Sequence, residues 1–346
     1  MKYLFYLIAA IIFAFITSCD TTEPPVDNTE PGRRDYVWTI DTIDAPYNTY
    51  YRMWGSSPDD IWMVSNGDWD KSIAHFDGKK WKTFGIPKIF PLAIYGFAEN
   101  EIYISAYGGL IWRYDGASWT KFAELTKDGH NDIVLGNIWG GSPDDFYTLG
   151  AYPDEFGNNN SVIFHYNNSQ WQKCNTGSLY GLVTHLYEDE NNLIYLQVIE
   201  IGGGRHLDTT HIYEYSAGKY TNLRSTVWEK GSESDIFLIN DEVFFVLGHR
   251  IYTRSNNNFN LIVDVNNPNF YQRIWGRNSR DLFLLMTDGL VHYNGNDMEY
   301  LFYFNEPDKK PWTQIFGAAV FENEVFFYVS EANPNRNLIY HGKLTE

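Results

Sequence analysis

The stretch MWGSSPDDIWMVS at residues 53–65 decides the fold, because two close copies of it return later in the chain. IWGGSPDDFYTLG begins at Ile138, and IWGRNSRDLFLLM begins at Ile274. Weaker copies bring the number to seven: IYGFAENEIYISA at Ile94, LYEDENNLIYLQV at Leu186, IFLINDEVFFVLG at Ile236 and IFGAAVFENEVFFYVS at Ile315. Self-similarity of this kind is the sequence signature of a repeat architecture.

A second short pattern follows each copy, as in IAHFDGKKW from Ile73 and IWRYDGASW from Ile111. Alternating apolar residues separated by Pro, Asp, Asn and Gly are hairpin signals, so each repeat is predicted to contain four short strands. A period of about 40 to 50 residues with four strands per unit is typical of propeller blades. We therefore predict an all-β fold, a seven-bladed β-propeller of four-stranded blades over residues 36–346.

The two ends of this region complement each other. Tyr36 to Ile40 (YVWTI) has the pattern of an outermost strand without a blade of its own, whereas the last repeat stops at LIYHGKLTE from Leu338 without its final aromatic strand. We expect the N-terminal strand to complete the last blade, because closure removes an exposed sheet edge.

The pair of patterns WGSSPDDIW and YDGxxW resembles propeller-type repeat lipoproteins of Gram-negative bacteria and, more loosely, the Asp-box and kelch-like propellers. The resemblance covers residues 36–346 and concerns architecture. The stricter Asp-box pattern Ser-x-Asp-x-Gly-x-Thr-Trp is not met at Asp77 or Asp115, so a sialidase is not supported.

The N-terminus has the pattern of an export signal. Lys2 precedes the apolar run Leu4–Ile16, which has the length of a secretory signal and is short for a membrane span. The following Ile16-Thr17-Ser18-Cys19 resembles a bacterial lipobox. This resemblance implies that residues 1–18 are a cleaved signal peptide and that Cys19 becomes acylated, for example with palmitate, which anchors the protein stably. An ordinary secretory signal with a chance cysteine, or an uncleaved anchor, remains the alternative.

Residues 20–35 are rich in Pro, Thr and acidic residues, and together with Cys19 they are expected to form a flexible tether over 19–35. The formal charge of −18 argues against nucleic acid as a partner, since nucleic acid requires a basic face. Cys174 is the only cysteine besides Cys19, so the exported domain has no intrachain disulfide and depends on its core.

The residues that recur between repeats are interpreted as packing residues. Trp54, Trp139 and Trp275 return at equivalent places, which contact between blades requires and ligand stacking does not. His75, His165 and His292 also share one repeat position, so we expect no metal cluster and no cofactor. Asp60, Asp145 and Asp281 follow a polar turn, where their carboxylates are expected to accept backbone N–H groups; a calcium site is the alternative.

Nearly every long insertion belongs to one set of connections. In a four-stranded blade, the links between strands two and three and between successive blades share one face, and these are the long ones here. Functional loops on a rigid scaffold gather on one side, so we predict a single elaborated face. Its candidate ligand residues are Trp69, Asp70, Tyr152, Asp154, Glu155, Phe156, Arg205, His206, Asp208, Glu331 and Arg336. The alternative is that these are solvated variable loops.

From these patterns we predict a monomeric, non-enzymatic binding or scaffold lipoprotein of a Gram-negative cell envelope, lipid-anchored to the outer rather than the inner membrane. It is expected to hold a partner protein or a glycan on the elaborated face. The first alternative is a glycan hydrolase or lyase that uses Asp154 or Glu155 with Asp208, for which two carboxyls must lie roughly 5 to 10 Å apart. The second is a purely structural envelope component, which would have no cavity and no aromatic cluster on either face.

Overall fold

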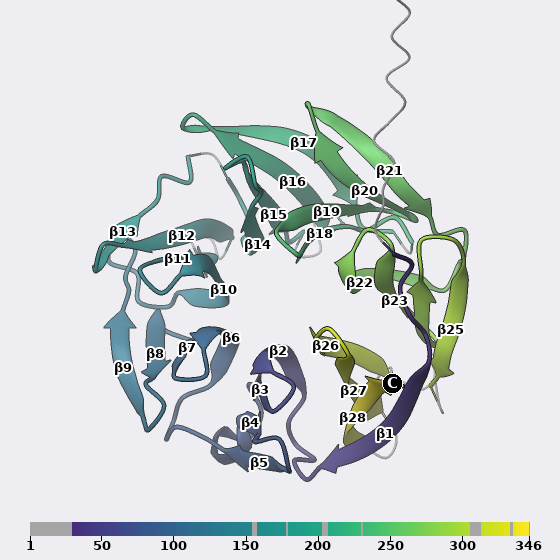
Figure 1. The fold of residues 1–346 in the computed structure, drawn as a ribbon. Helices are drawn as coiled ribbons and strands as arrows, with labels where there is room; N and C mark the ends of the chain where they lie inside the picture. The colour runs from purple at the N-terminus through teal and green to yellow at the C-terminus, as the bar shows by residue number, and fades with distance from the viewer. Residues whose placement is uncertain are drawn as a thin grey trace, which may run out of the picture. The chain divides into compact units, whose positions relative to one another are not determined.

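Seven four-stranded antiparallel sheets arranged in a ring make up the protein, so the predicted seven-bladed β-propeller is confirmed (Figure 1). The structure is a computed structural model that describes residues 30–153, 158–177, 179–202, 207–229, 231–304, 313–332 and 335–345. Residues 31–346 form one compact unit. The expected signal peptide and Cys19 lie outside the described residues.

Blades one to four each take four consecutive strands of the chain. Blade one consists of β2 (Tyr50–Ser57), β3 (Asp60–Ser65), β4 (Ile73–Phe76) and β5 (Trp81–Phe84), with a 3-10 turn η1 (Trp69–Lys71) before β4. Blade two consists of β6 (Pro91–Ala98), β7 (Glu101–Ala106), β8 (Leu110–Tyr114) and β9 (Trp119–Glu124). Blade three consists of β10 (Val134–Ser142), β11 (Asp145–Pro153), β12 (Asn159–Asn167) and β13 (Gln170–Lys173). Blade four consists of β14 (Leu182–Glu188), β15 (Ile194–Glu200), β16 (Thr209–Ser216) and β17 (Lys219–Val227).

The last three blades complete the ring, and the seventh takes its outermost strand from the start of the chain. Blade five consists of β18 (Ser234–Ile239), β19 (Glu242–Leu247), β20 (Arg250–Ser255) and β21 (Asn258–Asp264). Blade six consists of β22 (Phe270–Asn278), β23 (Asp281–Met286), β24 (Gly289–Tyr293) and β25 (Met298–Tyr303). Blade seven consists of β26 (Gln314–Val320), β27 (Glu324–Ala332), β28 (Asn335–Leu344) and β1 (Tyr36–Ile43).

The blades are held together by side chains on both faces of each sheet. In β3, Ile61 and Met63 pack toward blade seven, in one cluster with Phe326 and Tyr328. The intervening Trp62 and Val64 pack toward blade two. Because successive side chains of a strand point to opposite faces, a blade buried on both sides needs a nearly continuous apolar strand. The repeat IWMVS has this character for that reason.

Strand β1 closes the ring, as the sequence predicts. It pairs antiparallel with β28 from Tyr36 opposite Leu344 to Ile43 opposite Asn337, and Figure 1 shows the purple β1 beside the yellow β28. Trp38 lies on this strand with its ring 5.2 Å from that of Phe302 in blade six and 6.3 Å from that of Phe327 in blade seven. The first strand therefore joins the last blade to its neighbour.

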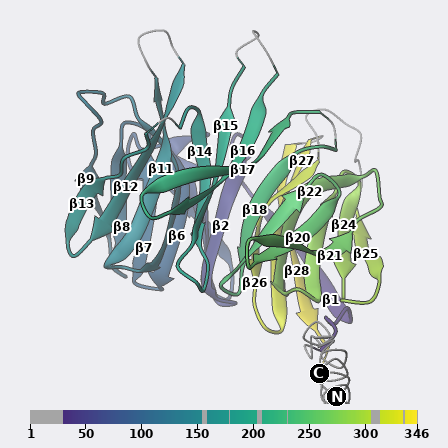
Figure 2. The ribbon, with the colours of Figure 1, turned by 90° about the horizontal axis from the view of Figure 1, so that it is seen from above.

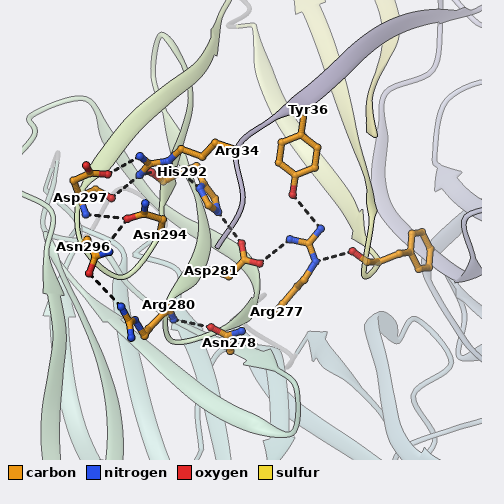
Figure 3. A network of polar contacts seen from close by, with 11 residues as sticks. Arg34, Tyr36, Arg277, Asn278, Arg280, Asp281, His292, Asn294, Asn296 and Asp297 are labelled. Atoms are coloured by element: carbon orange, nitrogen blue, oxygen red, sulfur yellow. Dashed lines mark hydrogen bonds and ion pairs between the residues drawn. The ribbon is translucent and has the colours of Figure 1, made fainter. Parts of the chain in front are cut away.

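The chain already contacts the propeller before β1 begins, over residues that the sequence assigns to the tether. The Gly32 N–H donates to the Arg280 carbonyl at 3.1 Å, and a Cβ at Gly32 would lie 2.8 Å from the Asp281 carboxyl group. Arg34 donates to the His292 carbonyl at 2.9 Å and forms an ion pair with Asp297 at 2.5 Å (Figure 3). Composition alone assigns this segment to a tether. Its two arginines hold it in place, because Arg34 binds to blade six and Arg33 binds to the end of the chain.

The strand order gives the ring two different faces. The antiparallel order places the links between strands two and three and those between blades on one face, which we call the long-loop face. The links between strands one and two and between strands three and four lie on the other, the short-turn face. Strand β1 starts and β28 ends at the short-turn face, where Tyr36 pairs with Leu344 (Figure 2). Within the described residues, no helix has the length and apolar character that crossing a bilayer requires.

We expect ring closure to depend on Trp38. Replacing Trp38 by Ala removes a half-buried ring from between blades six and seven and should lower the free energy of unfolding by about 2 kcal/mol. The neighbouring Val37, whose side chain is 60% exposed, is the control, and Val37→Ala should cost less than about 1 kcal/mol. Urea unfolding followed by tryptophan fluorescence measures both. Equal effects of the two substitutions would show that β1 does not close the ring through this contact.

Candidate functional site

The histidines that recur between repeats take part in a clamp within the blade. In blade one, His75 Nε2 lies 2.8 Å from Asp60 Oδ1, and the indole N–H of Trp62 donates to the same oxygen at 2.7 Å. The imidazole stacks on the Trp62 ring with centroids 3.8 Å apart. One carboxylate thus fixes a stacked pair of rings on adjacent strands.

Four other blades repeat this arrangement, with an acid at the start of the second strand and a base on the third. The acid–base distances are 2.7 Å for Glu101–Arg113, 2.5 Å for Asp145–His165, 2.7 Å for Asp281–His292 and 2.7 Å for Glu324–His341. The expectation that Asp60, Asp145 and Asp281 accept turn N–H groups is wrong, because their carboxylates accept from side chains. Among the described residues, no three His, Cys, Asp or Glu side chains are grouped to hold a metal.

The clamp of blade six is the most buried and also holds the N-terminal segment. His292 is fully buried, and Asp281 accepts from it and from Arg277 Nη1 at 2.8 Å (Figure 3). Arg277 in turn donates to the hydroxyl of Tyr36 at 3.1 Å. Burial alone would raise the pKa of Asp281, but the hydrogen bond from His292 and the charge of Arg277 outweigh it and hold this pKa below its ordinary value.

The recurring tryptophans pack between blades, as the sequence suggests. The Trp54 ring covers Gly96 of the next blade, where a Cβ would lie 2.5 Å from the ring. The glycine that follows the inner aromatic of blade two therefore leaves room for the Trp54 ring of the neighbouring blade. Trp139 is likewise buried, in one cluster with Leu186 of blade four. These residues are structural.

Three of the predicted ligand residues lie on the long-loop face with side chains open to solvent. Trp69 is on η1 with 41% of its surface exposed, and Asp70 beside it is exposed. Tyr152 is half-buried at the end of β11, with the ring of His130 5.0 Å away.

The other three described candidates are engaged by their own loops. Glu331 and Arg336 face each other on the hairpin between β27 and β28 and form an ion pair, with Arg336 Nε 2.7 Å from Glu331 Oε2. The carboxylate of Asp208 accepts the Gly202 N–H at 2.9 Å, which closes the base of its loop. Asp154, Glu155, Phe156, Arg205 and His206 lie outside the described residues, so the carboxylate pair of the enzymatic alternative is described only at Asp208.

Exposed apolar side chains are concentrated on the long-loop face, and only some of them were predicted from the sequence. Of 15 described large apolar residues that are exposed, 11 lie at this end of the strands or in its connections. They are Tyr47, Trp69, Phe90, Tyr107, Tyr180, Ile201, Leu207, Val227, Trp228, Tyr271 and Tyr303. Several of them, such as Tyr47, Phe90 and Tyr271, lie in or beside short links between blades, where no insertion marks a functional loop.

A cavity of about 350 Å³ opens among these residues at the long-loop ends of blades five to seven. Trp228 and Tyr271 line it together with polar side chains that include Asn269 and Thr287. A cavity with aromatic and polar walls suits a ligand that is partly apolar and carries hydrogen-bonding groups.

A second cavity, of about 500 Å³, follows the central channel. The first strands of the blades line it with Trp54, Trp139 and Trp275 and with charged residues that include Arg52 and Arg273. The geometry thus defines a closed seven-bladed β-propeller with an aromatic-rich face and a polar channel.

Comparison with known proteins supports the assignment to the β-propeller fold. No protein-family model matches the chain, and a search of curated proteins finds no match. Among solved structures, YCF48 bound to D1 peptide has a TM-score of 0.61 and 13% identity, covering 94% of this chain and 100% of that one.

Two other solved structures share the fold with similarly low sequence identity. An inactive virginiamycin B lyase from Staphylococcus aureus with quinupristin has a TM-score of 0.62 and 12% identity over 90% of this chain and 100% of that one. Raptor from Chaetomium thermophilum has a TM-score of 0.54 and 10% identity over 86% of this chain and 28% of that one. Identities this low show a shared fold.

The clamp of blade six should make stability depend on acid pH. At neutral pH, Asp281→Asn should lower the free energy of unfolding by about 3 kcal/mol, because Arg277 and His292 lose their charged partner. A lowered carboxyl pKa stabilises the fold above the unfolded value, near 3.8, and this contribution is lost as the pH falls through the folded value.

The difference in the free energy of unfolding between wild type and Asp281→Asn should therefore become smaller below about pH 4. Urea midpoints at pH 7, 5 and 3 measure it, with the exposed Asp41→Asn as the matched control. A gap of the same size at pH 3 as at pH 7 would contradict this account of the clamp.

Proposed function

We propose that this protein is a lipid-anchored envelope lipoprotein that binds a protein partner through the long-loop face of its propeller. The clustering of exposed aromatic and aliphatic residues on that face is the observation that carries the proposal. Large exposed apolar patches on soluble proteins mark interaction sites, and aromatic residues are enriched at the centres of protein interfaces.

The position of the chain ends supports an outward-facing binding surface. Gly32 and Arg34 are bound to blade six at the short-turn face, so the first contacts of the described chain lie on the side opposite the exposed aromatic residues. An anchor at Cys19 is then compatible with a long-loop face directed away from the membrane. In this proposal the membrane is the outer one of a Gram-negative envelope.

The solved relatives are consistent with such a role. YCF48, a protein of similar fold, has been solved bound to D1 peptide, which supports a peptide or protein as the ligand class. A glycan remains the other ligand class for the same face. The cavity and the aromatic cluster are features that a purely structural envelope component would not have.

The glycan-active alternative stays a prediction without a structural argument. Of its carboxylates, Asp154 and Glu155 lie outside the described residues, and the Asp208 carboxylate accepts a backbone N–H of its own loop.

Removing the exposed aromatics should abolish partner binding and leave the fold intact. We expect the triple variant Tyr47→Ser, Trp228→Ser, Tyr271→Ser to lose at least about tenfold in capture of its partner from envelope extract, since interface aromatics contribute most of the binding energy. Quantitative mass spectrometry of proteins retained by the immobilised full chain measures capture.

The matched control carries Leu261→Ser and Met298→Ser, which are 54% and 40% exposed but lie away from the long-loop face. Both variants should unfold at the wild-type urea concentration within error. Equal retention of the same proteins by the triple variant and the wild type would refute the assignment of the binding face.

Anchoring should depend on Cys19 alone. Cys19→Ala should move the protein from the membrane fraction to the soluble fraction and abolish incorporation of labelled palmitate in the native host. Cys174→Ala is the control, because burial raises the pKa of the Cys174 thiol to about 11 and leaves it unreactive. Continued membrane association of Cys19→Ala would show an anchor of another kind.

A further inference from the structure

One position of the repeat varies in residue type while the two positions after it do not. It is the position of Arg52 in blade one, and in all seven repeats it is followed by Met, Ile or Leu and then by an aromatic residue. The position itself holds Arg52, Ala93, Asn137, His185, Asp235, Arg273 and Gln314 in blades one to seven. Packing between blades fixes the uniform positions, whereas a position that changes from cation to anion to amide has no common packing role.

These residues lie on the innermost strands, near their long-loop ends. Five of them, namely Arg52, Asn137, His185, Asp235 and Arg273, line the channel cavity of about 500 Å³. Equivalent positions of successive blades form a ring around the axis of a propeller, so we call these seven residues the channel ring.

In one half of the channel ring, the polar side chains already have hydrogen-bond partners within the protein. His185 Nδ1 lies 3.3 Å from Asp235 Oδ1 and 2.9 Å from the side-chain oxygen of Gln197. Asn137 donates to the Thr184 carbonyl at 2.8 Å. The only carboxylate of the ring is therefore already paired, with the imidazole of the adjacent blade.

The two arginines have no such partner. Arg52 Nη1 donates to the Tyr51 carbonyl at 3.1 Å, and Arg273 Nη1 donates to the Ile315 carbonyl at 3.4 Å. Within the described part of the chain, neither guanidinium forms an ion pair. A guanidinium has five N–H donors, so most donors of both side chains remain available to a ligand in the channel.

This lack of partners is unusual in this protein. Seven other described arginines pair with carboxylates: Arg33, Arg34, Arg113, Arg250, Arg254, Arg277 and Arg336. The chain has 44 acidic residues against 26 basic ones, so carboxylates are abundant. Two channel arginines with no carboxylate partner among the described residues therefore place positive charge in a protein whose formal net charge is −18.

The two charges also oppose each other. Burial lowers the pKa of Arg52 and the positive charge of Arg273 lowers it further, and the smaller opposite effect of the Asp235 carboxylate does not offset them. Blades one and six, which carry the two residues, are separated only by blade seven. Holding two like charges in a half-buried channel destabilises the empty fold, and an anion between them removes that cost.

We propose that the channel binds an oxoanion, a carboxylate or a phosphate group, between the guanidinium groups of Arg52 and Arg273. Guanidinium groups bind both anions with paired N–H···O bonds. Trp54 and Trp275, which line the same cavity, offer apolar surface to the carbon skeleton of an organic anion. This site lies in the channel and does not rest on the proposed function of the long-loop face.

The test is isothermal titration calorimetry of the full chain at low ionic strength with two probes, inorganic phosphate and succinate. At least one of them should bind, and the double variant Arg52→Gln, Arg273→Gln should weaken that binding by at least about tenfold. Binding of phosphate alone identifies a phosphate site, and binding of succinate alone identifies a carboxylate site. The control is Arg250→Gln, which removes an exposed arginine paired with Asp264 and should leave binding unchanged.

A second measurement separates a binding role from a structural one. Without anion, the double variant should melt at the same temperature as the wild type or higher, because a like-charge repulsion is removed. The bound anion should raise the melting temperature of the wild type only. Absence of binding by both probes up to about 10 mM, or equal binding to the double variant, would overturn the proposal.

Discussion

Each blade of this protein buries both faces of its sheet, and this constraint determines the rest of the architecture. A strand such as β3 sends Ile61 and Met63 to one neighbour and Trp62 and Val64 to the other. A blade with only one neighbour would expose half of these residues, so the array is stable only when it closes. Pairing of β1 with β28 provides that closure, and the Trp38 ring and the docked Arg34 extend it to blade six.

The same constraint separates structural residues from residues available for function. The inner aromatics recur because they pack between blades, and the acid–base clamps recur because they join the second and third strands within five of the blades. Positions that differ between blades are those that packing leaves free, namely the channel ring and the links on the long-loop face. The variable positions of the repeat are therefore the candidates for function, whereas the recurring tryptophans and histidines have structural roles.

The architecture was predictable from the sequence because its signals are local and repeated seven times. The copies of IWGGSPDD mark the first hairpin of each blade, and the unmatched YVWTI segment shows how the ring closes. The site was less predictable, since it depends on contacts between residues distant in sequence. Glu331 and Arg336 appeared available as ligand residues but bind each other, whereas Trp228 and Tyr271 line one cavity only in the folded ring. The docking of Arg34 on Asp297 likewise joins segments that no periodic pattern relates.

The pairing of β1 with β28 also has a consequence for biogenesis. The strand that completes the last blade precedes all seven repeats, and its partner lies in the last of them. Tyr36 and Trp38 therefore stay unpaired until the seventh repeat has been made. Long-range pairing of this kind is slow and leaves strand edges open to aggregation. A propeller closed in this way gains from protection of its first strand until the last repeat is complete, or from folding that is fast once it is.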